Sequence, residues 1–536
     1  MFEIMAASTS KRFGFSNEFF SQLFLIFLAS LTIRVGVAMW GHSGEGKPPM
    51  FGDFEAQRHW MEITVNLPFK EWYVDTPNND LQYWGLDYPP LTAYHMMLNG
   101  KIAQHVNSSI VALHESRGIE TPQVKFFMRA TVIVMDALLF LPSAAAFFML
   151  EGSGKRDEAS ILKRIMVLVG YPGLVLVDSG HFQYNSISLG LVVLASSALT
   201  RGFDLVGAFL FCLSLNYKQM ELYHALPFFA YLFGSCIRQT NPSKGLFKFT
   251  MLVLVVAITF IALWSPFLHS VDSALAVVHR LFPVKRGLYE DKVANFWCSV
   301  SILIKFKEML SQAAMAFVCL ATTAVFLLPS FFHLLMNPNM KNFHYASINS
   351  SLIFFLFSFH VHEKTILLAT IPACLVVARD PFIVLWFLQI SVFSMLPLLL
   401  KDGLLIPVIA TTLLFWIILH YYLRPTEGIR RELKLIFQMS ILGAVGVSLV
   451  FLLVKPPVRY PDLFTLLIAI YSCAHFMMFA VYFHARQFGS SLTKFIFAAD
   501  AAKKRDDYED DKISSPRSSV QNVEQRNFNL RSRKRK

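Results

Sequence analysis

Charged residues are scarce in this sequence. They make up 16% of its 536 residues, whereas a typical soluble domain has about 25%. Hydrophobic residues reach 55%, phenylalanine alone occurs 52 times, and the mean hydropathy is +0.48. This balance excludes an ordinary soluble protein and predicts an all-α polytopic membrane protein. The formal net charge of +12 does not indicate nucleic-acid binding, because the basic residues lie mostly in short loops and in the C-terminal tail.

Cysteine is also scarce, and the six cysteines are scattered along the chain without a CxxC pair or a metal-binding spacing. Reduced, buried thiols are therefore the favoured interpretation. A cleavable signal peptide is not expected. Lys11 and Arg12 precede an apolar run that is long enough to remain in the bilayer, and no small-residue cleavage site follows it.

Apolar runs of roughly 17–25 residues predict membrane-spanning helices. We expect about fourteen spans, several of them shorter than a full bilayer crossing, which tilt and mutual packing can accommodate. No internal repeat is recognisable. The predicted spans are 19–39, 126–150, 162–177, 184–199, 205–215, 222–236, 246–264, 313–335, 345–359, 366–377, 382–400, 404–419, 435–454 and 463–483.

The basic residues between these spans predict the orientation of the chain. They fall on one side, which is therefore expected to be cytosolic and to hold both termini. The opposite side receives the long loop 40–125, the loop 267–311 and three short turns. A glycosylation sequon at Asn107 lies on that side, as expected for a lumen. The basic residues are Lys11, Arg12, Lys155, Arg156, Lys163, Arg164, Arg238, Lys244, Lys248, Arg424, Arg430, Arg431 and Lys434.

The same pattern predicts three parts. Residues 1–18 are a cytosolic N-terminus, residues 19–485 form the membrane domain, and residues 486–536 are a disordered, basic cytosolic tail. The basic end of the tail is compatible with an endoplasmic reticulum retrieval signal and equally with a tether to the membrane surface.

The long loop is rich in tryptophan and tyrosine, so we expect a folded cap that carries chemistry rather than a disordered connection. Asp53 follows a glycine and precedes a helical stretch, 54–65. It is either the N-cap of that helix or a carboxylate that faces a substrate. Glu55 and His59 lie at i and i+4 and form either an ordinary helical pair or part of a metal site, for which a third ligand is not evident.

Two further polar stretches are each open to two interpretations. Asp87 and Tyr88 precede a Pro-Pro turn. Asp87 either caps the next helix or faces the site, and Tyr88 either stacks on a sugar or packs the loop. The turn 178–185 concentrates hydrogen-bonding side chains, including His181 and Gln183, at a membrane edge. Such groups must be paired or solvated, and ligand contact and helix capping explain them equally well.

The last candidate residues are cationic. Arg286 stands in a basic run beside Gly287, which suits an anion site because a guanidinium binds phosphate through a fork of donors. Attraction to lipid headgroups is the alternative. His362 and Lys364 lie between two spans, where phosphate binding, a metal site and snorkelling to the interface are all open.

Two classes of protein fit these residues. One is a membrane enzyme acting on a lipid-linked phosphate substrate, and the other is a transporter of such a lipid. A transporter should carry its polar residues near the middle of the bilayer, in broken helices and repeated positions. Here they cluster on one face of the membrane, which favours the enzyme.

At these same residues the sequence resembles the dolichyl-phosphate-glucose-dependent α-1,3-glucosyltransferases of the endoplasmic reticulum. The resemblance covers roughly residues 15–490 and excludes the tail. The stretches 55–62 and 290–297 look like the branch that adds the first glucose to the Man9GlcNAc2 lipid-linked oligosaccharide, and not the branch that adds the second. Val284-Lys285 departs slightly from the pattern. The motifs are 52–60, 84–91, 180–185, 280–283 with 286–288 and 290–298, and 361–364.

The resemblance implies a GT-C glycosyltransferase fold of about fourteen transmembrane helices, with a structured lumenal first loop that holds the base. It also implies inversion, in which β-linked glucose on dolichyl phosphate becomes α-1,3-linked. Asp53 matches the family's catalytic carboxylate. One carboxylate is enough to take the proton of the acceptor hydroxyl. A second carboxyl group, as in many glycosidases, is not required, because the leaving phosphate needs only charge stabilisation.

We therefore expect Asp53 to be catalytic, with no metal and no other cofactor. The expected partners are dolichyl phosphate glucose, the lipid-linked oligosaccharide and membrane lipid, without nucleic acid. The alternative functions are the second-glucose transferase of the same pathway and a lipid-linked sugar transporter. The candidate substrate-binding residues are Glu55, His59, Asp87, Tyr88, His181, Gln183, Arg286, His362 and Lys364.

Overall fold

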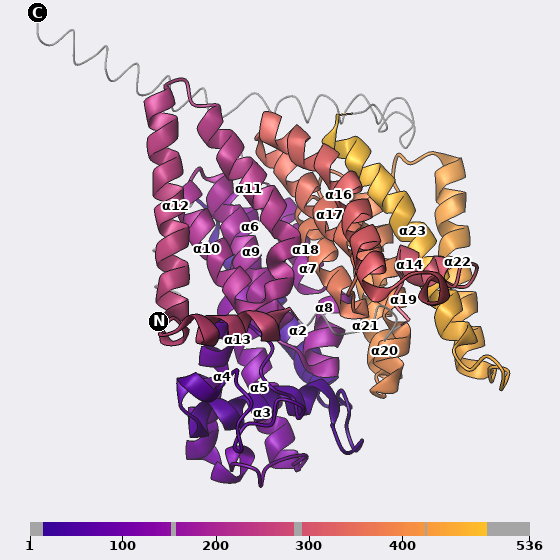
Figure 1. The fold of residues 1–536 in the computed structure, drawn as a ribbon. Coiled ribbons are helices and arrows are strands. Elements are labelled where there is room, and N and C mark those ends of the chain that lie inside the picture. The colour runs from indigo at the N-terminus through magenta and orange to yellow at the C-terminus, as the bar shows by residue number, and fades with distance from the viewer. Residues whose placement is uncertain (1–13, 152–156, 283–291, 424–425, 490–536) are drawn as a thin grey trace, which may run out of the picture.

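The computed structural model describes residues 14–151, 157–282, 292–423 and 426–489, and within these ranges the chain is built of helices and connecting loops (Figure 1). The only β-type pairing in the described ranges is an isolated bridge between Thr76 and Asn79. The predicted all-α fold class is therefore confirmed.

Seven helical segments of the described chain are long and apolar enough to cross a membrane. Two of them are interrupted, since each contains a π-helical turn and a proline close to it. The continuous segments are α2 (Asn17–Ala38), α12 (Pro242–Trp264), α16 (Gln312–Met336), α22 (Arg431–Leu453) and α23 (Leu463–Gln487). The interrupted ones are α5 (Pro122–Met135), η3 (Asp136–Phe140) and α6 (Leu141–Leu150), then α7 (Glu158–Val169), α8 (Pro172–Val175) and η4 (Leu176–Phe182).

Shorter helices fill the rest of the bundle. Every predicted span coincides with a helical segment, although prolines divide some of them: Pro397 follows the break between α19 and α20. The positions of the helices are thus confirmed, whereas the number of crossings stays a prediction. The shorter helices are α9 (Asn185–Thr200), α10 (Asp204–Tyr217), α11 (Leu222–Ile237), α17 (Met340–Phe357), α18 (Leu367–Leu375), α19 (Pro381–Ser394), α20 (Leu396–Lys401) and α21 (Leu405–Leu423).

The bundle has an apolar core in which α17, α18, α19 and α23 pack against one another. Rings of Phe387 and Phe479 lie 5.3 Å apart in an edge-on arrangement, which aromatic pairs favour. All six cysteines are buried and free, as predicted.

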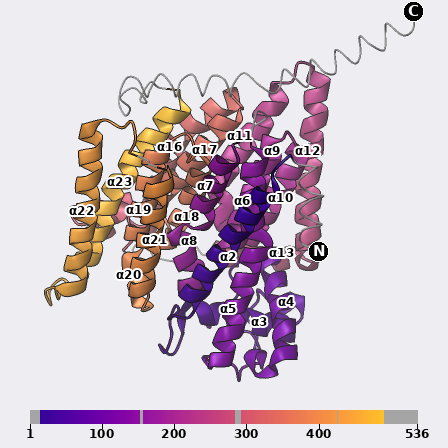
Figure 2. The same cartoon turned by 180° about the vertical axis from the view of Figure 1, so that it is seen from behind.

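The first long loop folds as a separate cap. It contains α3 (Gly52–Asn66), η1 (Phe69–Glu71), α4 (Pro90–Val106) and η2 (Ser108–Val111). Its large side chains, including Trp60, Met61 and Trp72, are buried in a second cluster that the cap shares with neighbouring bundle residues such as Phe127 and Phe182. Burial of these large side chains provides the stabilisation that a loop of this length needs. Figures 1 and 2 show α3 and α4 together beyond one end of the upright bundle.

The two ends of the bundle differ in chemistry. Helix α13 (Val271–Leu281) runs across the bundle next to the cap, whereas the link between α11 and α12 lies at the opposite end (Figure 1). Arg238 belongs to that link, and Lys244 to the first turn of α12. The cap and this basic link therefore occupy opposite ends, as the charge pattern predicted.

Two ionisable residues inside spans are paired, as expected for charges within a membrane. Arg34 Nε donates to Asp136 Oδ2 at 2.9 Å, and both side chains are fully buried. Arg34 also donates to the carbonyl oxygen of Val169 at 2.9 Å. This network ties α2 to the π-helical turn η3 and to the end of α7.

Candidate active site

The site is centred on the carboxylate of Asp53, at the start of α3. Three donors converge on its Oδ2 atom: His181 Nε2 at 3.0 Å, Gln183 Nε2 at 2.6 Å, and Lys364 Nζ. These residues come from the cap, from the end of η4, and from η7 (Glu363–Ile366). The structure thus brings together residues that stand 128 to 311 positions apart in the chain.

Local backbone geometry fixes this carboxylate. Phe51 and Gly52 both have positive φ, at 55° and 64°, and a Cβ on Gly52 would lie 2.6 Å from the backbone of Ser43. Glycine is therefore required at position 52. The hydroxyl of Ser43 accepts a hydrogen bond from the Asp53 amide at 3.1 Å, and the amide of Ser43 donates to the carbonyl of His181 at 2.9 Å. Ser43, which the sequence analysis did not single out, thereby joins the two halves of the site.

Asp53 is not the cap of its helix. The N-cap of α3 is Phe51, whose side chain makes no capping hydrogen bond, and the Asp53 amide is bonded instead to the Ser43 hydroxyl. The capping interpretation is therefore wrong, and the carboxylate is available for contacts outside α3. It keeps 23% of its surface exposed. No hydrogen bond within the described part of the chain reaches its Oδ1 atom.

The surroundings keep Asp53 ionised. Burial raises the pKa of this carboxyl, but the positive charge of Lys364 and the hydrogen bond from His181 outweigh burial and hold the pKa well below its ordinary value. An ionised carboxylate with one oxygen unoccupied can accept a proton.

His181 has a second carboxylate on its other face. Its Nδ1 atom lies 2.6 Å from Oδ2 of Asp402, which directly follows α20. The side chain of Asp402 is 5% exposed. The sequence analysis missed Asp402. The only signal was a short polar break, Lys401-Asp402-Gly403, between two apolar runs.

Lys218 is a second residue that the sequence analysis missed. Its ammonium donates to Asn185 Oδ1 and lies 5.2 Å from the centre of the Tyr88 ring. Burial, followed by the positive charge of Lys364, lowers the pKa of Lys218 to about 8, while Asp178 and Asp53 oppose this shift. Lys218 therefore belongs to the electrostatic surroundings of the site.

The turn 178–185 confirms the capping interpretation, whereas its contact with a ligand stays a prediction. Asp178 accepts hydrogen bonds from the Asn185 side chain at 2.7 Å and from the Ser186 amide at 2.6 Å, so it caps the start of α9. His181 and Gln183 face Asp53 instead. The Oε1 atom of Gln183 is buried and has no hydrogen-bond partner in the described residues.

Glu55 and His59 form ion pairs and hydrogen bonds inside the cap. Arg58 binds Glu55 through two hydrogen bonds of 2.7 and 2.6 Å, and Tyr83 donates to the same carboxylate at 2.9 Å. His59 pairs with Glu62 at 3.2 Å. The predicted pairing of Glu55 with His59 is therefore wrong, because a stronger partner, Arg58, lies three residues from Glu55.

The acidity of Glu62 shows how strongly this network is ionised. Burial raises its pKa, but the hydrogen bond from His59 and the charge of Arg58 lower it to about 2. Both Glu55 and His59 are almost fully buried within the cap. Their direct contact with substrate stays a prediction.

The remaining candidates are Asp87, Tyr88, His362 and Arg286. The carbonyl of Asp87 accepts from the Gln219 side chain at 2.9 Å, and Tyr88 packs on Trp60 with ring centres 4.9 Å apart. Both are half-buried. His362 immediately precedes η7 and is half-buried close in sequence to Lys364. Arg286 lies outside the described residues.

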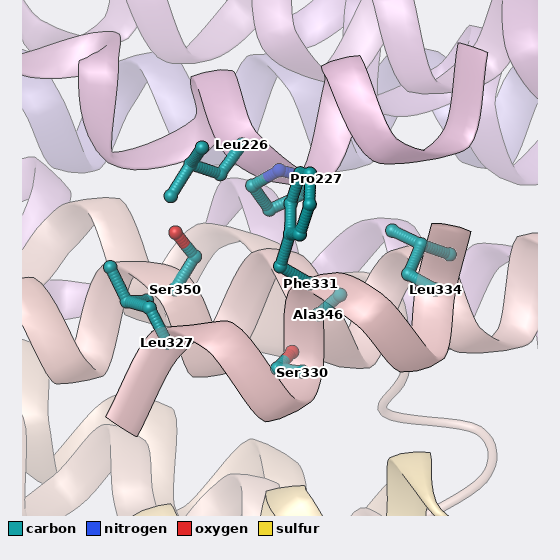
Figure 3. A pocket seen from close by; sticks show the side chains of 8 residues that line it. All are labelled: Leu226, Pro227, Leu327, Ser330, Phe331, Leu334, Ala346 and Ser350. Atoms are coloured by element: carbon teal, nitrogen blue, oxygen red, sulfur yellow. The ribbon is translucent and has the colours of Figure 1, made fainter. Parts of the chain in front are cut away.

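A small cavity lies elsewhere, between α11, α16 and α17 (Figure 3). Its two hydroxyls are already bonded, since Ser330 donates to Gln487 Oε1 at 2.6 Å and Ser350 donates to the carbonyl of Tyr223. The other lining side chains are apolar: Leu226, Pro227, Leu327, Phe331, Leu334 and Ala346. The cavity therefore offers no acid or base, and none of its residues is bonded to Asp53, His181 or Lys364.

Comparisons with known proteins point to one family. A family model described as the ALG6, ALG8 glycosyltransferase family matches residues 26–482. A mouse protein named dolichyl pyrophosphate Man9GlcNAc2 alpha-1,3-glucosyltransferase is 45% identical, with 86% of this chain and 95% of the relative covered. Relatives named as probable enzymes of the same kind are 45% identical in Drosophila melanogaster (86% and 98% covered) and 41% identical in Arabidopsis thaliana (90% and 92% covered).

Proposed function

Because the chain belongs to the ALG6, ALG8 glycosyltransferase family, we propose that it transfers the first glucose to Man9GlcNAc2-PP-dolichol from dolichyl phosphate glucose, with inversion. The protein is an α-1,3-glucosyltransferase of lipid-linked oligosaccharide assembly. Three points beyond this activity are proposed: the donor is dolichyl phosphate glucose, the transfer inverts the linkage, and the acceptor is the unglucosylated oligosaccharide and not the monoglucosylated one.

One observation carries the proposed mechanism: a single ionised carboxylate, Asp53, has one oxygen held by three donors and the other open to an incoming group. The acceptor hydroxyl gives its proton to Asp53 as its oxygen attacks the anomeric carbon. The bond between that carbon and the phosphate oxygen breaks, and the phosphate leaves with the electron pair. Attack from the face opposite the leaving group inverts the β-linkage to α.

Lys364 is placed to serve both sides of the reaction. Its ammonium contacts Asp53 and lies 3.4 Å from His181 Nε2. A flexible lysine can turn from the carboxylate towards a departing phosphate, where a fixed positive charge stabilises developing negative charge. We assign His362 to the phosphate side for its position beside Lys364, and Arg286 for its guanidinium chemistry alone.

We assign the acceptor side to the cap and to the turn 178–185. The Oε1 atom of Gln183, which has no hydrogen-bond partner among the described residues, can accept a hydrogen bond from a sugar hydroxyl. Tyr88 offers a half-buried ring beside Lys218, and such rings stack on sugars. Asp87 belongs to the same turn.

The arrangement in the membrane supports a GT-C fold of about fourteen transmembrane helices, as expected for the family. The cap and the site lie at the end of the bundle opposite the basic link between α11 and α12. By the positive-inside rule this end faces the lumen of the endoplasmic reticulum, with both termini in the cytosol.

Purified protein should be assayed with dolichyl phosphate glucose and two acceptors, one unglucosylated and one carrying a single glucose. The proposal expects product from the unglucosylated acceptor and none from the other. Product only from the monoglucosylated acceptor would identify the second-glucose branch. A protein that turns over neither acceptor would contradict both transferase assignments and favour a transporter.

A further inference from the structure

We propose that Asp402 is a positioning residue for the transfer reaction, acting through His181 to hold the imidazole against the Asp53 carboxylate. The inference rests on the proposed function, since it assigns a role within that same site. The observation that carries it is a continuous chain of three buried or half-buried side chains, from Asp402 through His181 to Asp53.

The imidazole lies between two carboxylates. Nδ1 is 2.6 Å from Asp402 Oδ2, and Nε2 is 3.0 Å from Asp53 Oδ2. An imidazole can donate at both nitrogens only when it is protonated at both, and two carboxylate acceptors favour that form. Asp402 therefore fixes the ring orientation and keeps an N–H group aimed at Asp53.

The turn that holds Asp402 is packed closely against the rest of the site. Gly41 lies so near that a Cβ on it would stand 2.2 Å from the carbonyl oxygen of Asp402, and a Cβ on Gly180 would stand 2.8 Å from the Leu404 side chain. The contact at Gly41 is with backbone and leaves no space for a larger residue, whereas the contact at Gly180 is with the end of a side chain. The segment after α2, the end of η4 and the turn after α20 are thus in direct contact around His181.

The elements packed around His181 contribute charges of both signs. Asp53 from α3 and Asp402 from the turn after α20 are negative, while Lys364 from η7 and the protonated His181 from η4 are positive. Arg129 from α5 donates to the carbonyl oxygens of Ser179 and Gly41, at 2.6 and 2.9 Å. The four groups at the centre sum to zero charge, which limits the cost of their burial.

The role of Asp402 in the reaction follows from the charges of these groups. When Asp53 takes the proton of the acceptor hydroxyl, it loses its negative charge, while His181 keeps both of its protons. Asp402 then is the remaining carboxylate on the imidazolium and prevents the ring from turning away. Without Asp402 the ring can rotate, and the carboxylate of Asp53 loses one of its three donors in the reactive state.

The test is Asp402→Asn in the full-length protein, assayed with dolichyl phosphate glucose and the acceptor that the wild type uses. We expect kcat to fall about 10- to 100-fold, with the KM for both substrates unchanged. Loss of a carboxylate that orients a metal-binding histidine has an effect of this size. Lys47→Met is the matched control. Lys47 donates to the carbonyl of Lys401 at 2.9 Å and so supports the same turn without touching the imidazole. It should retain the wild-type kcat.

A double-mutant cycle separates positioning from simple structural support. If Asp402 acts through His181, then Asp402→Asn should cost nothing further in a His181→Gln background. An unchanged kcat in the single variant, or losses that multiply in the double variant, would overturn the inference.

Should Asp402→Asn fail to fold, Gly41→Ala gives a second test, because its Cβ would stand 2.2 Å from the backbone carbonyl oxygen of Asp402 and must displace that turn from His181, while both carboxylates remain. We expect a kcat loss that disappears in the His181→Gln background, and wild-type kcat would overturn the inference. Failure of the proposed function is distinguishable, because the wild type itself would then make no product from the unglucosylated acceptor.

Discussion

Replacement of Lys364 by methionine tests the electrostatics of the site. Lys364 and Asp53 are in direct contact, and their side chains are only 18% and 23% exposed. Two unit charges 4 Å apart interact by about 4 kcal/mol at an effective dielectric of 20, and removal of one partner from a buried pair costs about 3–5 kcal/mol. For the reaction itself, we expect removal of this charge to cost about 2–3 kcal/mol of transition-state stabilisation, which is about 30- to 160-fold in kcat/KM at neutral pH.

The pH dependence of this loss identifies its cause. In the wild type the charge of Lys364 helps to hold the pKa of Asp53 well below its ordinary value, against burial, which raises it. Without that charge the pKa of Asp53 rises. The acid limb of the kcat/KM profile reports protonation of the base in the free enzyme, so it should move to higher pH.

The assay is glucose transfer by purified protein from mildly acidic to alkaline pH, with Lys364→Arg as the control that retains the charge. The arginine variant should keep the acid limb close to that of the wild type. An acid limb that stays in place in Lys364→Met, with a uniform loss at every pH, would refute the reasoning. Lys364 would then act on the phosphate alone.

Three further outcomes are expected. Glu55→Gln should lower the stability of the detergent-solubilised protein by about 1–3 kcal/mol, since it weakens a buried charged hydrogen bond to Arg58. The exposed Glu115→Gln is the control. Equal melting temperatures of the two variants would contradict this prediction. Glucose transfer should persist in excess chelator, and complete loss that a divalent ion restores would contradict a metal-independent reaction. Asn107 lies in a partly exposed sequon at the start of η2, so Asn107→Gln should abolish an endoglycosidase-sensitive mobility shift, whereas Asn349→Gln, at a buried sequon in α17, should not. A mobility shift that survives in Asn107→Gln would show that the glycan is attached at another residue, and it would contradict modification of this loop in the lumen.

The sequence allowed correct predictions where several functional residues are close together in the chain. His181 and Gln183 could be selected because polar side chains at a membrane edge require partners, and both prove to bind Asp53. The predicted helices also coincide with helical segments, because long hydrophobic runs indicate helices in an apolar environment, whether bilayer or protein interior. The π-helical turn that ends at Phe182 was not predictable, although it is what directs His181 towards α3.

Long-range contacts were the part that sequence could not supply. Asp402 stands 221 residues from His181, in a turn whose composition does not differ from that of many helix connections. Lys218 was similarly hidden in a short link. Glu55 was assigned to the wrong partner, because i and i+4 spacing makes His59 a possible neighbour, whereas a guanidinium at i+3 binds a carboxylate more strongly.

The account depends on Asp53 taking a proton from the acceptor, and Asp53→Asn tests this most directly. Asparagine preserves the volume of the side chain and removes only its negative charge. In purified protein we predict that kcat falls by about a hundred- to ten-thousand-fold, the usual contribution of a general base, with unchanged expression and membrane insertion. Transfer by Asp53→Asn at a rate close to that of the wild type would contradict the assignment of the base.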